Sequence, residues 1–286
     1  MANLKELRTR IGSVSSTMQI TSAMKMVSAA KLKRAQDAIT QMRPYAGKLK
    51  ELLENLSASL ENSADGKYSE EREIKKVLLV NIASNRGLCG GFNSNVSKKV
   101  NAIKKESYPN ADVSLLTIGK KMTEFGDRSE YTVYDSNIAI FDDLSFDNSA
   151  QISEKIMKAF VDGEFDRVDL VYNQFVNAAT QDTVQEQFLP VAPIESEGAT
   201  TREYAFEPSK EEIITDLIPK SLKIQVFKAL LDSHASEHGA RMTAMHKATD
   251  NAGELKADLT LQYNRQRQAA ITNEILEIVG GAEALA

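Results

Sequence analysis

Two short patterns in this chain combine residue types that do chemistry. The first is His234-Ala-Ser-Glu237-His238, whose H-x-x-E-H spacing matches one zinc-peptidase signature. Residues four apart share a helix face, so two histidines at this spacing can ligate one metal ion. A working zinc site also needs a third ligand and an open cleft, which a position in the seam between two helices does not supply. We therefore interpret both histidines as packed or partly exposed helix residues and predict no metal site.

The second pattern is a glycine-rich turn, Asn85-Arg-Gly-Leu-Cys-Gly-Gly-Phe-Asn93, between an apolar run and a helix-like segment. Such a turn can cradle a phosphate when its backbone N–H groups point at the ligand. Its spacing fits neither the dinucleotide-binding pattern nor the P-loop, and no P-loop sequence occurs anywhere in the chain. The sequence favours a tight strand-to-helix turn, with a protein contact as the next alternative.

No other combination of residues indicates catalysis. The chain has three histidines, His234, His238 and His246, and all fall in one expected helix, so no Ser/His/Asp arrangement can be argued. The single cysteine, Cys89, cannot form an internal disulfide and has no partners at metal-ligand spacing. We predict no catalytic residue, no cofactor and no small-molecule substrate.

Apolar residues near the start of the chain recur at alternating steps of three and four. The series is Leu4, Leu7, Ile11, Val14 and Met18, and it resumes as Leu32, Ala35, Ile39, Met42, Ala46, Leu49, Leu53, Leu56 and Leu60. This heptad spacing predicts one long helix over residues 2–60, with a phase shift near Met24 and Val27. Pro44 is expected to bend or break that helix.

The end of the chain mirrors its start. Residues 220–279 contain no proline and two glycines, and the seam runs through Leu231, Ala235, His238, Met242 and Met245. The apolar stripe continues in shifted phases at Leu255, Leu259, Ile271, Ile275 and Ile278. Gly280 and Gly281 are expected to cap this second long helix. Two helices of matched length can bury narrow seams against each other as an antiparallel coiled coil.

Strand-like and helix-like segments alternate between the two helices, which predicts a Rossmann-like α/β domain with a largely parallel sheet. The expected fold class is therefore α/β plus a long antiparallel coiled coil. We divide the chain into an N-terminal coiled-coil helix (1–61), a linker (62–73), a globular domain (74–208) and a C-terminal coiled-coil helix (209–286).

Charge is distributed unevenly along the chain. The net charge is −5, yet residues 1–50 hold ten Lys and Arg against two acidic residues, about +8. Such a segment can meet nucleic acid, anionic lipid or an acidic protein surface, and charge alone does not choose among them. No run approaches the roughly 18 apolar residues of a membrane span, and the start lacks a secretory signal. We expect an intracellular protein that meets a membrane only peripherally.

Four segments resemble the gamma subunits of F-type rotary, proton-translocating ATP synthases of bacterial type. They are IGSVSSTMQITSAMKMVSAAKLKRAQ near the start, NRGLCGGFN, YNQFVNAATQ, and SEHGARMTAMHKATDNAGEL with LTLQYNRQRQAAITNEILEIVGGAEAL at the end. The match is long, ordered and spread over the chain, and only residues 101–150 match loosely. Thiol control through the cysteine-bearing insertion of the chloroplast form is excluded, because this chain lacks that insertion.

The resemblance implies a central rotor shaft without a catalytic site of its own. The implied partners are the alpha and beta subunits of the catalytic head, the epsilon subunit and the c-subunit membrane ring, with no nucleic acid. The implied location is the cytoplasmic side of the cell membrane, as a peripheral protein. Rotation of the shaft would bias the beta subunits among open, loose and tight nucleotide states and so couple ion flow to ATP synthesis or hydrolysis.

The family's contact residues carry over onto seven positions of this sequence. Contacts with beta subunits fall on Met24, Lys25, Arg267, Gln268 and Thr272, and contacts with the membrane ring on Tyr204 and Glu207. Arg267 can offer a forked donor to a carboxylate.

Three positions depart from the family pattern: Asn85 replaces a common Asp, Ser22 a common Lys, and Gly239 a common Ala. Glycine at position 239 should soften the helix by about 1 kcal/mol. The basic N-terminal segment keeps a second function class open, a nucleic-acid-binding coiled-coil protein, whose binding would depend strongly on salt. A third class, an enzyme, predicts a ligand at the 87–91 turn.

Overall fold

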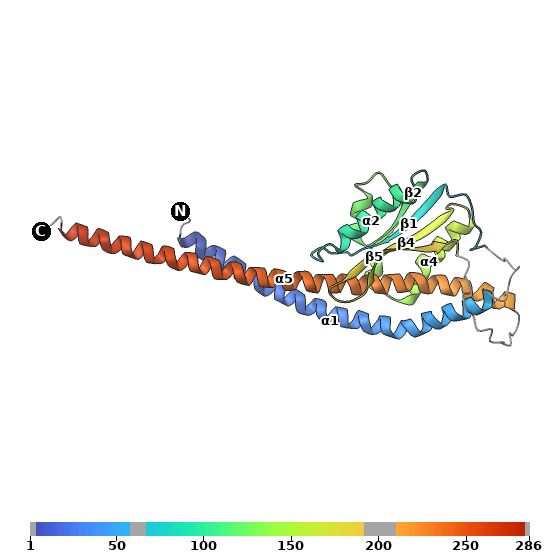
Figure 1. The fold of residues 1–286 in the computed structure, drawn as a ribbon, viewed down its shortest axis with the longest axis horizontal. Helices are drawn as coiled ribbons and strands as arrows, with labels where there is room; N and C mark the ends of the chain where they lie inside the picture. Colours follow the sequence, from blue (N-terminus) through green and yellow to red (C-terminus); the bar gives the residue numbers. More distant parts are fainter. Residues whose placement is uncertain (1–3, 58–66, 192–209, 284–286) are drawn as a thin grey trace. The chain divides into compact units, whose positions relative to one another are not determined.

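The structure, a computed structural model, describes residues 4–57, 67–191 and 210–283 (Figure 1). Its elements are α1 (Leu4–Ser57), β1 (Lys76–Ile82), α2 (Phe92–Glu106), β2 (Asp112–Ile118), α3 (Lys120–Gly126), β3 (Thr132–Asn137), the 3-10 turn η1 (Ala139–Phe141), α4 (Phe146–Val161), β4 (Arg167–Phe175), β5 (Gln181–Leu189) and α5 (Lys210–Glu283). The chain divides into two compact units. We call residues 1–28 with 242–286 the terminal unit, and residues 29–241 the central unit.

A five-stranded sheet in the order β3-β2-β1-β4-β5 organises the central unit. The pairs β1–β2, β2–β3 and β1–β4 are parallel, and β4–β5 is antiparallel. A parallel connection needs a crossover of a dozen or more residues, whereas the short turn 176–180 only allows a hairpin. In that turn the Asn177 N–H donates to the Thr180 carbonyl over 3.1 Å. The prediction of a largely parallel α/β sheet is confirmed.

Alternating side chains of β1 serve two separate cores, because successive residues of a strand point to opposite faces. On one face Leu78 and Val80 pack with α4 and with α5, where Leu230 is fully buried. On the other face Val77 and Leu79 pack with apolar residues of α2. Both faces of the sheet are therefore covered by helices, as a parallel sheet requires. Figure 1 shows α2 on one side of the sheet and α5 on the other.

In the terminal unit, α1 and α5 run antiparallel. The Thr249 hydroxyl donates to the Thr21 hydroxyl over 2.8 Å, and the Lys256 ammonium donates to the Ser15 hydroxyl over 3.1 Å. Residue numbers thus fall along one helix as they rise along the other. The expected antiparallel pairing of the terminal helices is confirmed.

The expected phase shift in α1 is wrong, because a single heptad continues through the helix. Every seventh residue from Leu7 to Leu49 is buried or half-buried: Leu7, Val14, Thr21, Ser28, Ala35, Met42 and Leu49. The repeat looks interrupted in the sequence because Thr21 and Ser28 are polar. Thr21 takes the hydrogen bond from Thr249, and the Ser28 hydroxyl donates to the Met24 carbonyl over 2.7 Å. These bonds make polar residues acceptable in the seam.

Proline and glycine stop neither long helix where expected. Helix α1 continues through Pro44, and α5 begins at Lys210 and includes Pro219. The predicted cap at Gly280 and Gly281 is wrong, since α5 runs through both glycines to Glu283. A glycine in a helix interior costs only about 1 kcal/mol relative to alanine, so its presence alone does not end a helix.

Candidate partner-binding surface

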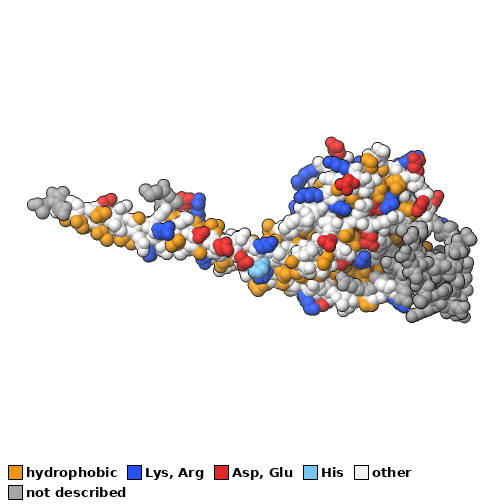
Figure 2. Space-filling view, viewed as in Figure 1, with side chains coloured by type: hydrophobic (Ala, Val, Ile, Leu, Met, Phe, Trp, Pro, Cys, Tyr) orange, Lys and Arg blue, Asp and Glu red, His pale blue; other side chains and the backbone are white. Residues whose placement is uncertain are grey.

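The end of α5 in the terminal unit exposes a row of large apolar side chains. They are Ile271, Ile275, Leu276, Ile278 and Val279, with Leu276 62% and Ile278 71% exposed. The predicted stripe through Ile271, Ile275 and Ile278 therefore exists as a pattern, but it does not pack on α1. Hydrophobic side chains lie along this end in the space-filling view (Figure 2). A contiguous exposed apolar surface of this kind indicates an interaction site.

The register of the two helices explains this exposure. Ser15 lies beside Lys256 and Thr21 beside Thr249, so Leu4 is expected to reach roughly position 266 of α5, since both helices rise equally per residue. Beyond that point α5 has no counterpart among the described residues of α1. An isolated helix of this length is marginal in water, and packing supplies most helix stability in proteins. The unpaired end of α5 is therefore built to pack on something else.

Helix α1 adds three outward-facing apolar residues to the terminal unit, and sequence reasoning missed them. Ile20, Met26 and Val27 are 60%, 65% and 58% exposed. They lie outside the heptad positions that face α5. The signal that identifies them is the unbroken heptad, which requires assigning Thr21 and Ser28 to the seam despite their polarity.

The five residues predicted to contact beta subunits fall into two separate groups. Met24 and Lys25 are half-buried on α1, next to the stretch that pairs with Thr249, whereas Arg267, Gln268 and Thr272 are exposed on α5. Along α5, position 267 lies roughly 27 Å from position 249 at 1.5 Å per residue. The structure thus assembles the α5 residues, which begin the unpaired end, but does not bring them together with Met24 and Lys25.

Within the α5 group, the Thr272 hydroxyl donates to the Gln268 carbonyl over 2.9 Å, while both side chains stay exposed. The predicted ring contacts, Tyr204 and Glu207, lie outside the described residues.

The glycine-rich turn, residues 85–93, contacts α5 of the same chain. Helix α5 approaches it so that the Arg241 guanidinium donates to the carbonyls of Arg86 and Gly87 over 3.2 and 3.3 Å. Carbonyl oxygens that accept from a cation have the opposite polarity to a phosphate cradle, which presents N–H groups. At the tip, Leu88 takes a positive φ of 62° and is 65% exposed. These contacts confirm a tight turn that is held from within the chain.

Close packing gives Gly239 a structural role. A Cβ at this position would lie 3.3 Å from both the Cα and the carbonyl oxygen of Ala178 in the β4–β5 turn. Glycine at position 239 thus lets α5 approach the β4–β5 hairpin closely. This packing accounts for a residue that is otherwise unfavourable in a helix.

The H-x-x-E-H segment forms a buried cluster rather than an open zinc site. His234 Nε2 and His238 Nε2 lie 3.1 Å apart, and the Glu237 carboxylate accepts from Arg241 Nη1 over 2.6 Å. Glu237, the expected catalytic base of such a motif, is therefore engaged in an ion pair. Within the part of the chain that the structure describes, no group of three or more His, Cys, Asp and Glu side chains is placed to hold a metal ion.

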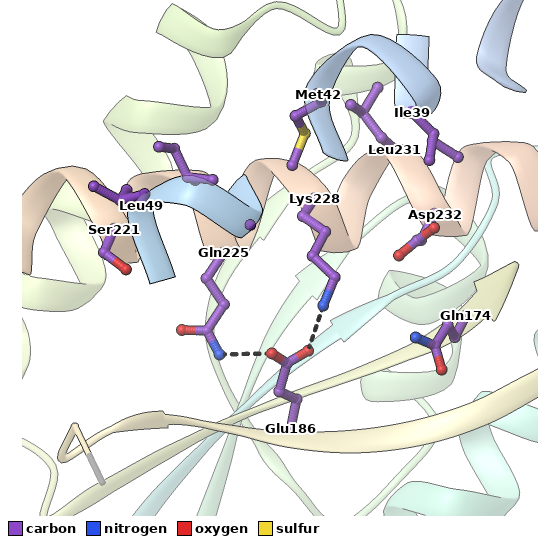
Figure 3. Close-up of a pocket in the computed structure, with 12 residues that line it drawn as sticks. Ile39, Met42, Leu49, Gln174, Glu186, Ser221, Gln225, Lys228, Leu231 and Asp232 are labelled. Atoms are coloured by element: carbon purple, nitrogen blue, oxygen red, sulfur yellow. Dashed lines mark hydrogen bonds and ion pairs between the residues drawn. The ribbon is translucent and has the colours of Figure 1, made fainter. Parts of the chain in front are cut away.

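A cavity of about 580 Å³ lies in the central unit between α1, α5 and the β4–β5 hairpin (Figure 3). Apolar side chains such as Ile39 and Leu231 line its helical wall. On its polar wall, the Glu186 carboxylate accepts from Gln225 Nε2 over 3.0 Å and lies 3.7 Å from the Lys228 ammonium. The Tyr172 hydroxyl also donates to Glu186, over 2.7 Å. The Glu186 carboxylate is thus already bound by side chains of the same chain. We therefore interpret the cavity as a gap in packing and not as a ligand site.

Among residues 4–57, 67–191 and 210–283, none of the helices combines the length and the apolar character that a bilayer span requires.

The fold and its surfaces define a class: a coiled-coil protein with an α/β domain, whose most exposed apolar surface lies on its helices. Comparison with known proteins narrows this class. A family model described as "ATP synthase" matches residues 3–285. The ATP synthase gamma chains of Christiangramia forsetii and Flavobacterium johnsoniae are 61% and 63% identical over 285 and 286 residues, covering 100% of this chain and 99% of each relative.

Solved structures agree on the fold. One similar chain comes from the central stalk and c-ring structure of Tetrahymena thermophila mitochondrial ATP synthase. The match covers 80% of this chain and 99% of that chain, with 28% identity and a TM-score of 0.62. Another comes from the Euglena gracilis mitochondrial ATP synthase in rotational state 3. That match covers 99% of this chain and 94% of the Euglena chain, with 20% identity and a TM-score of 0.70. The chain belongs to the ATP synthase gamma-chain family.

Proposed function

We propose that this chain is the central rotor stalk of an ATP synthase and takes part in the complex as a non-catalytic subunit. One observation carries the proposal beyond family membership. The last turns of α5 are bare of α1 and expose Ile271, Ile275, Leu276, Ile278 and Val279. A shaft that turns inside a ring of other subunits needs an apolar surface of this kind at the end that enters the ring.

The mechanism follows from the shape of the terminal unit. Two paired helices resist bending and twisting more than one, so a torque applied to the pair reaches its end. The pair is also asymmetric, because its two helices expose different apolar side chains: Ile20, Met26 and Val27 on α1, and Leu255 and Leu261 on α5. An asymmetric rod presents a different surface to each surrounding subunit at each angle and biases that subunit among its conformations. Ion flow is thereby coupled to ATP synthesis or hydrolysis on the partner subunits.

We assign the contacts with beta subunits to Arg267, Gln268 and Thr272 at the start of the unpaired end, and to Met24 and Lys25 of α1, near residue 28, where the terminal unit's part of α1 ends. The alpha subunits complete the ring. Exposed polar groups suit a contact that must form and break in each turn, because such contacts are individually worth little. Arg267 is the strongest donor among them, since its guanidinium can bind a carboxylate with two hydrogen bonds.

The domain of residues 74–208 is assigned to the membrane side. We propose that Tyr204 and Glu207 meet the c-subunit ring, that the epsilon subunit binds there too, and that the chain is peripheral on the cytoplasmic side of the cell membrane. In this division of tasks, residues 1–61 and 209–286 form the shaft, 62–73 a linker, and 74–208 the domain that receives the torque.

Coexpression with the alpha and beta subunits of the same organism tests the proposal. Native mass spectrometry of the purified complex should show one copy of this chain with three alpha and three beta subunits. A matched variant, in which Ile275, Leu276 and Ile278 are all replaced by Asp, should fold alone but fail to co-purify. A chain that never associates with the other subunits, or a charged variant that associates normally, contradicts the proposed function.

A further inference from the structure

A buried polar cluster on α5 plays no part in the proposed rotor function. His238, Glu237 and Arg241 are each less than 10% exposed, and His234 lies beside them. The Arg241 guanidinium connects this cluster to the 85–91 turn through the carbonyls of Arg86 and Gly87. The cluster therefore joins α5 to the loop at the carboxyl end of β1.

The hydrogen bonds of the cluster run in one direction only. Arginine has no acceptor, so Arg241 Nη1 donates to His238 Nδ1 over 3.4 Å, and this nitrogen carries no proton. Neutral His238 is then protonated on Nε2, which donates to His234 Nε2 over 3.1 Å. His234 in turn carries its proton on Nδ1. The chain of bonds from Arg241 through His238 to His234 exists only while both imidazoles are neutral.

Protonation of either histidine breaks this chain. A proton on His234 Nε2 would face the N–H of His238, and a proton on His238 Nδ1 would face the N–H of Arg241. In each case two donors meet at hydrogen-bond distance without an acceptor, which a buried site does not tolerate. The geometry thus makes the neutral state of the pair a condition for the closed contact.

The charged groups around the pair act in the same sense. Lys31 faces it from α1, Arg241 from α5, and Arg86 of the turn adds a further cation near Glu237. The facing carboxylate, Glu237, is bound to Arg241. Phe141 of η1, which stacks on His234 at 6.1 Å between ring centres, is uncharged.

These surroundings lower both histidine pKa values. Burial first, then Lys31 and Arg241, lowers the pKa of His234 to about 4. Burial, His234 and the same cations lower the pKa of His238 to about 3.

We propose that His234 and His238 form a proton-operated clasp, which holds the 85–91 turn on α5 while both imidazoles are neutral and releases it when they take up protons. Opening returns both rings to water, where a histidine titrates near 6.5. Two protons are then taken up on opening, so acidification from pH 7.5 to 5.5 should raise the opening equilibrium about 100-fold. With one histidine replaced, the rise should be about tenfold.

Hydrogen exchange of the full-length chain at pH 7.5 and 5.5, corrected for the intrinsic pH dependence, tests the clasp. In the wild type, protection of residues 84–92 should fall about 100-fold at the lower pH. The double variant His234→Asn/His238→Gln should show little pH response. Glutamine can accept from Arg241 through its oxygen and donate to position 234 through its nitrogen, so the packing is kept. The matched control is His246→Gln, an exposed histidine on the same helix, which should behave as the wild type.

The proposal is overturned if the double variant keeps the wild-type response, or if the wild type shows none. A second measurement covers the case in which the double variant does not fold. Titration of the wild-type imidazole protons by NMR should show His234 and His238 changing shift well below the ordinary value of about 6.5. A normal titration of both histidines in the folded chain would equally remove the clasp.

Discussion

Helix α5 offers a direct comparison of two regions built on one element. Where it crosses the central unit, Leu222, Val226 and Leu230 are almost or fully buried against the sheet; near its end, Ile275 and Leu276 are more than half exposed. All of these side chains are aliphatic, and both stretches belong to one continuous helix. The difference lies only in what covers them. An apolar stripe in a sequence therefore reports that a helix packs on something, without saying whether the partner belongs to the same chain.

The largest expected effect comes from making one substitution on both sides of this comparison. Leu230→Ala removes a fully buried side chain and should lower the free energy of unfolding by about 2–5 kcal/mol. Leu276→Ala should change it by about 0.5 kcal/mol or less, because the side chain is 62% exposed in the isolated chain. Denaturant unfolding of the isolated variants measures both. Equal losses would show that the end of α5 is covered within the chain, and the comparison would break.

A second test uses pH to probe the central unit alone. The folded pKa values of His234 and His238 lie below the unfolded value, so their contribution to stability is fully present above about pH 6.5 and is lost as the pH falls toward 4. Between pH 7.5 and 5 the wild type should therefore lose about 4 kcal/mol more than His234→Asn/His238→Gln. Urea unfolding of both proteins at each pH measures this difference. A parallel decline of the two proteins would contradict the lowered values.

A third test addresses the polar seam of the terminal unit. Thr249→Val removes the bond that the Thr21 hydroxyl accepts and leaves it only its own donation to the Met18 carbonyl, which should cost about 1 kcal/mol. Replacing both threonines by valine should recover most of that loss, because two apolar groups of similar shape satisfy each other. A double-mutant cycle read by thermal unfolding gives the coupling energy. If the two single losses simply add, the two hydroxyls do not interact.

The smallest effect on the isolated chain, and the sharpest test of its exposed end, is expected for Arg267→Gln. This residue is exposed, so unfolding should change by no more than about 0.5 kcal/mol. Assembly with alpha and beta subunits should weaken by about tenfold, the loss of one charge-assisted hydrogen bond. Arg265→Gln, on the neighbouring exposed position, serves as the control in the same binding titration. If both variants bind equally well, Arg267 is a solvated charge.

Much of the fold could be predicted because its patterns are local. The heptads predicted both long helices, and the alternation of strand-like and helix-like segments predicted the sheet. The errors arose where a tertiary partner overrides a local signal. Thr21 and Ser28 look like a break in the seam until their hydrogen bonds are known. Gly280 and Gly281 look like a cap, yet the helix passes through them.

The candidate site was harder to predict than the fold. Arg267, Gln268 and Thr272 came from family resemblance, and nothing in their local pattern separates them from other exposed helix residues. The outward position of Ile20, Met26 and Val27 depends on the register of the heptad, which the polar seam residues conceal. The linkage of His238 to Arg241 and the 85–91 turn joins positions about 150 apart in the sequence, and spacing alone does not show such a contact.

The two polar contacts between α1 and α5 in the terminal unit also affect how far the helices overlap. An all-leucine seam offers nearly equal packing when one helix slides by a heptad, whereas polar residues at fixed seam positions select one alignment. The bonds from Thr249 to Thr21 and from Lys256 to Ser15 therefore fix the register of the two helices. A slip of one heptad would cover or uncover seven residues of α5, roughly 10 Å of helix. The two contacts thus determine how far the unpaired end of α5 extends past its neighbour.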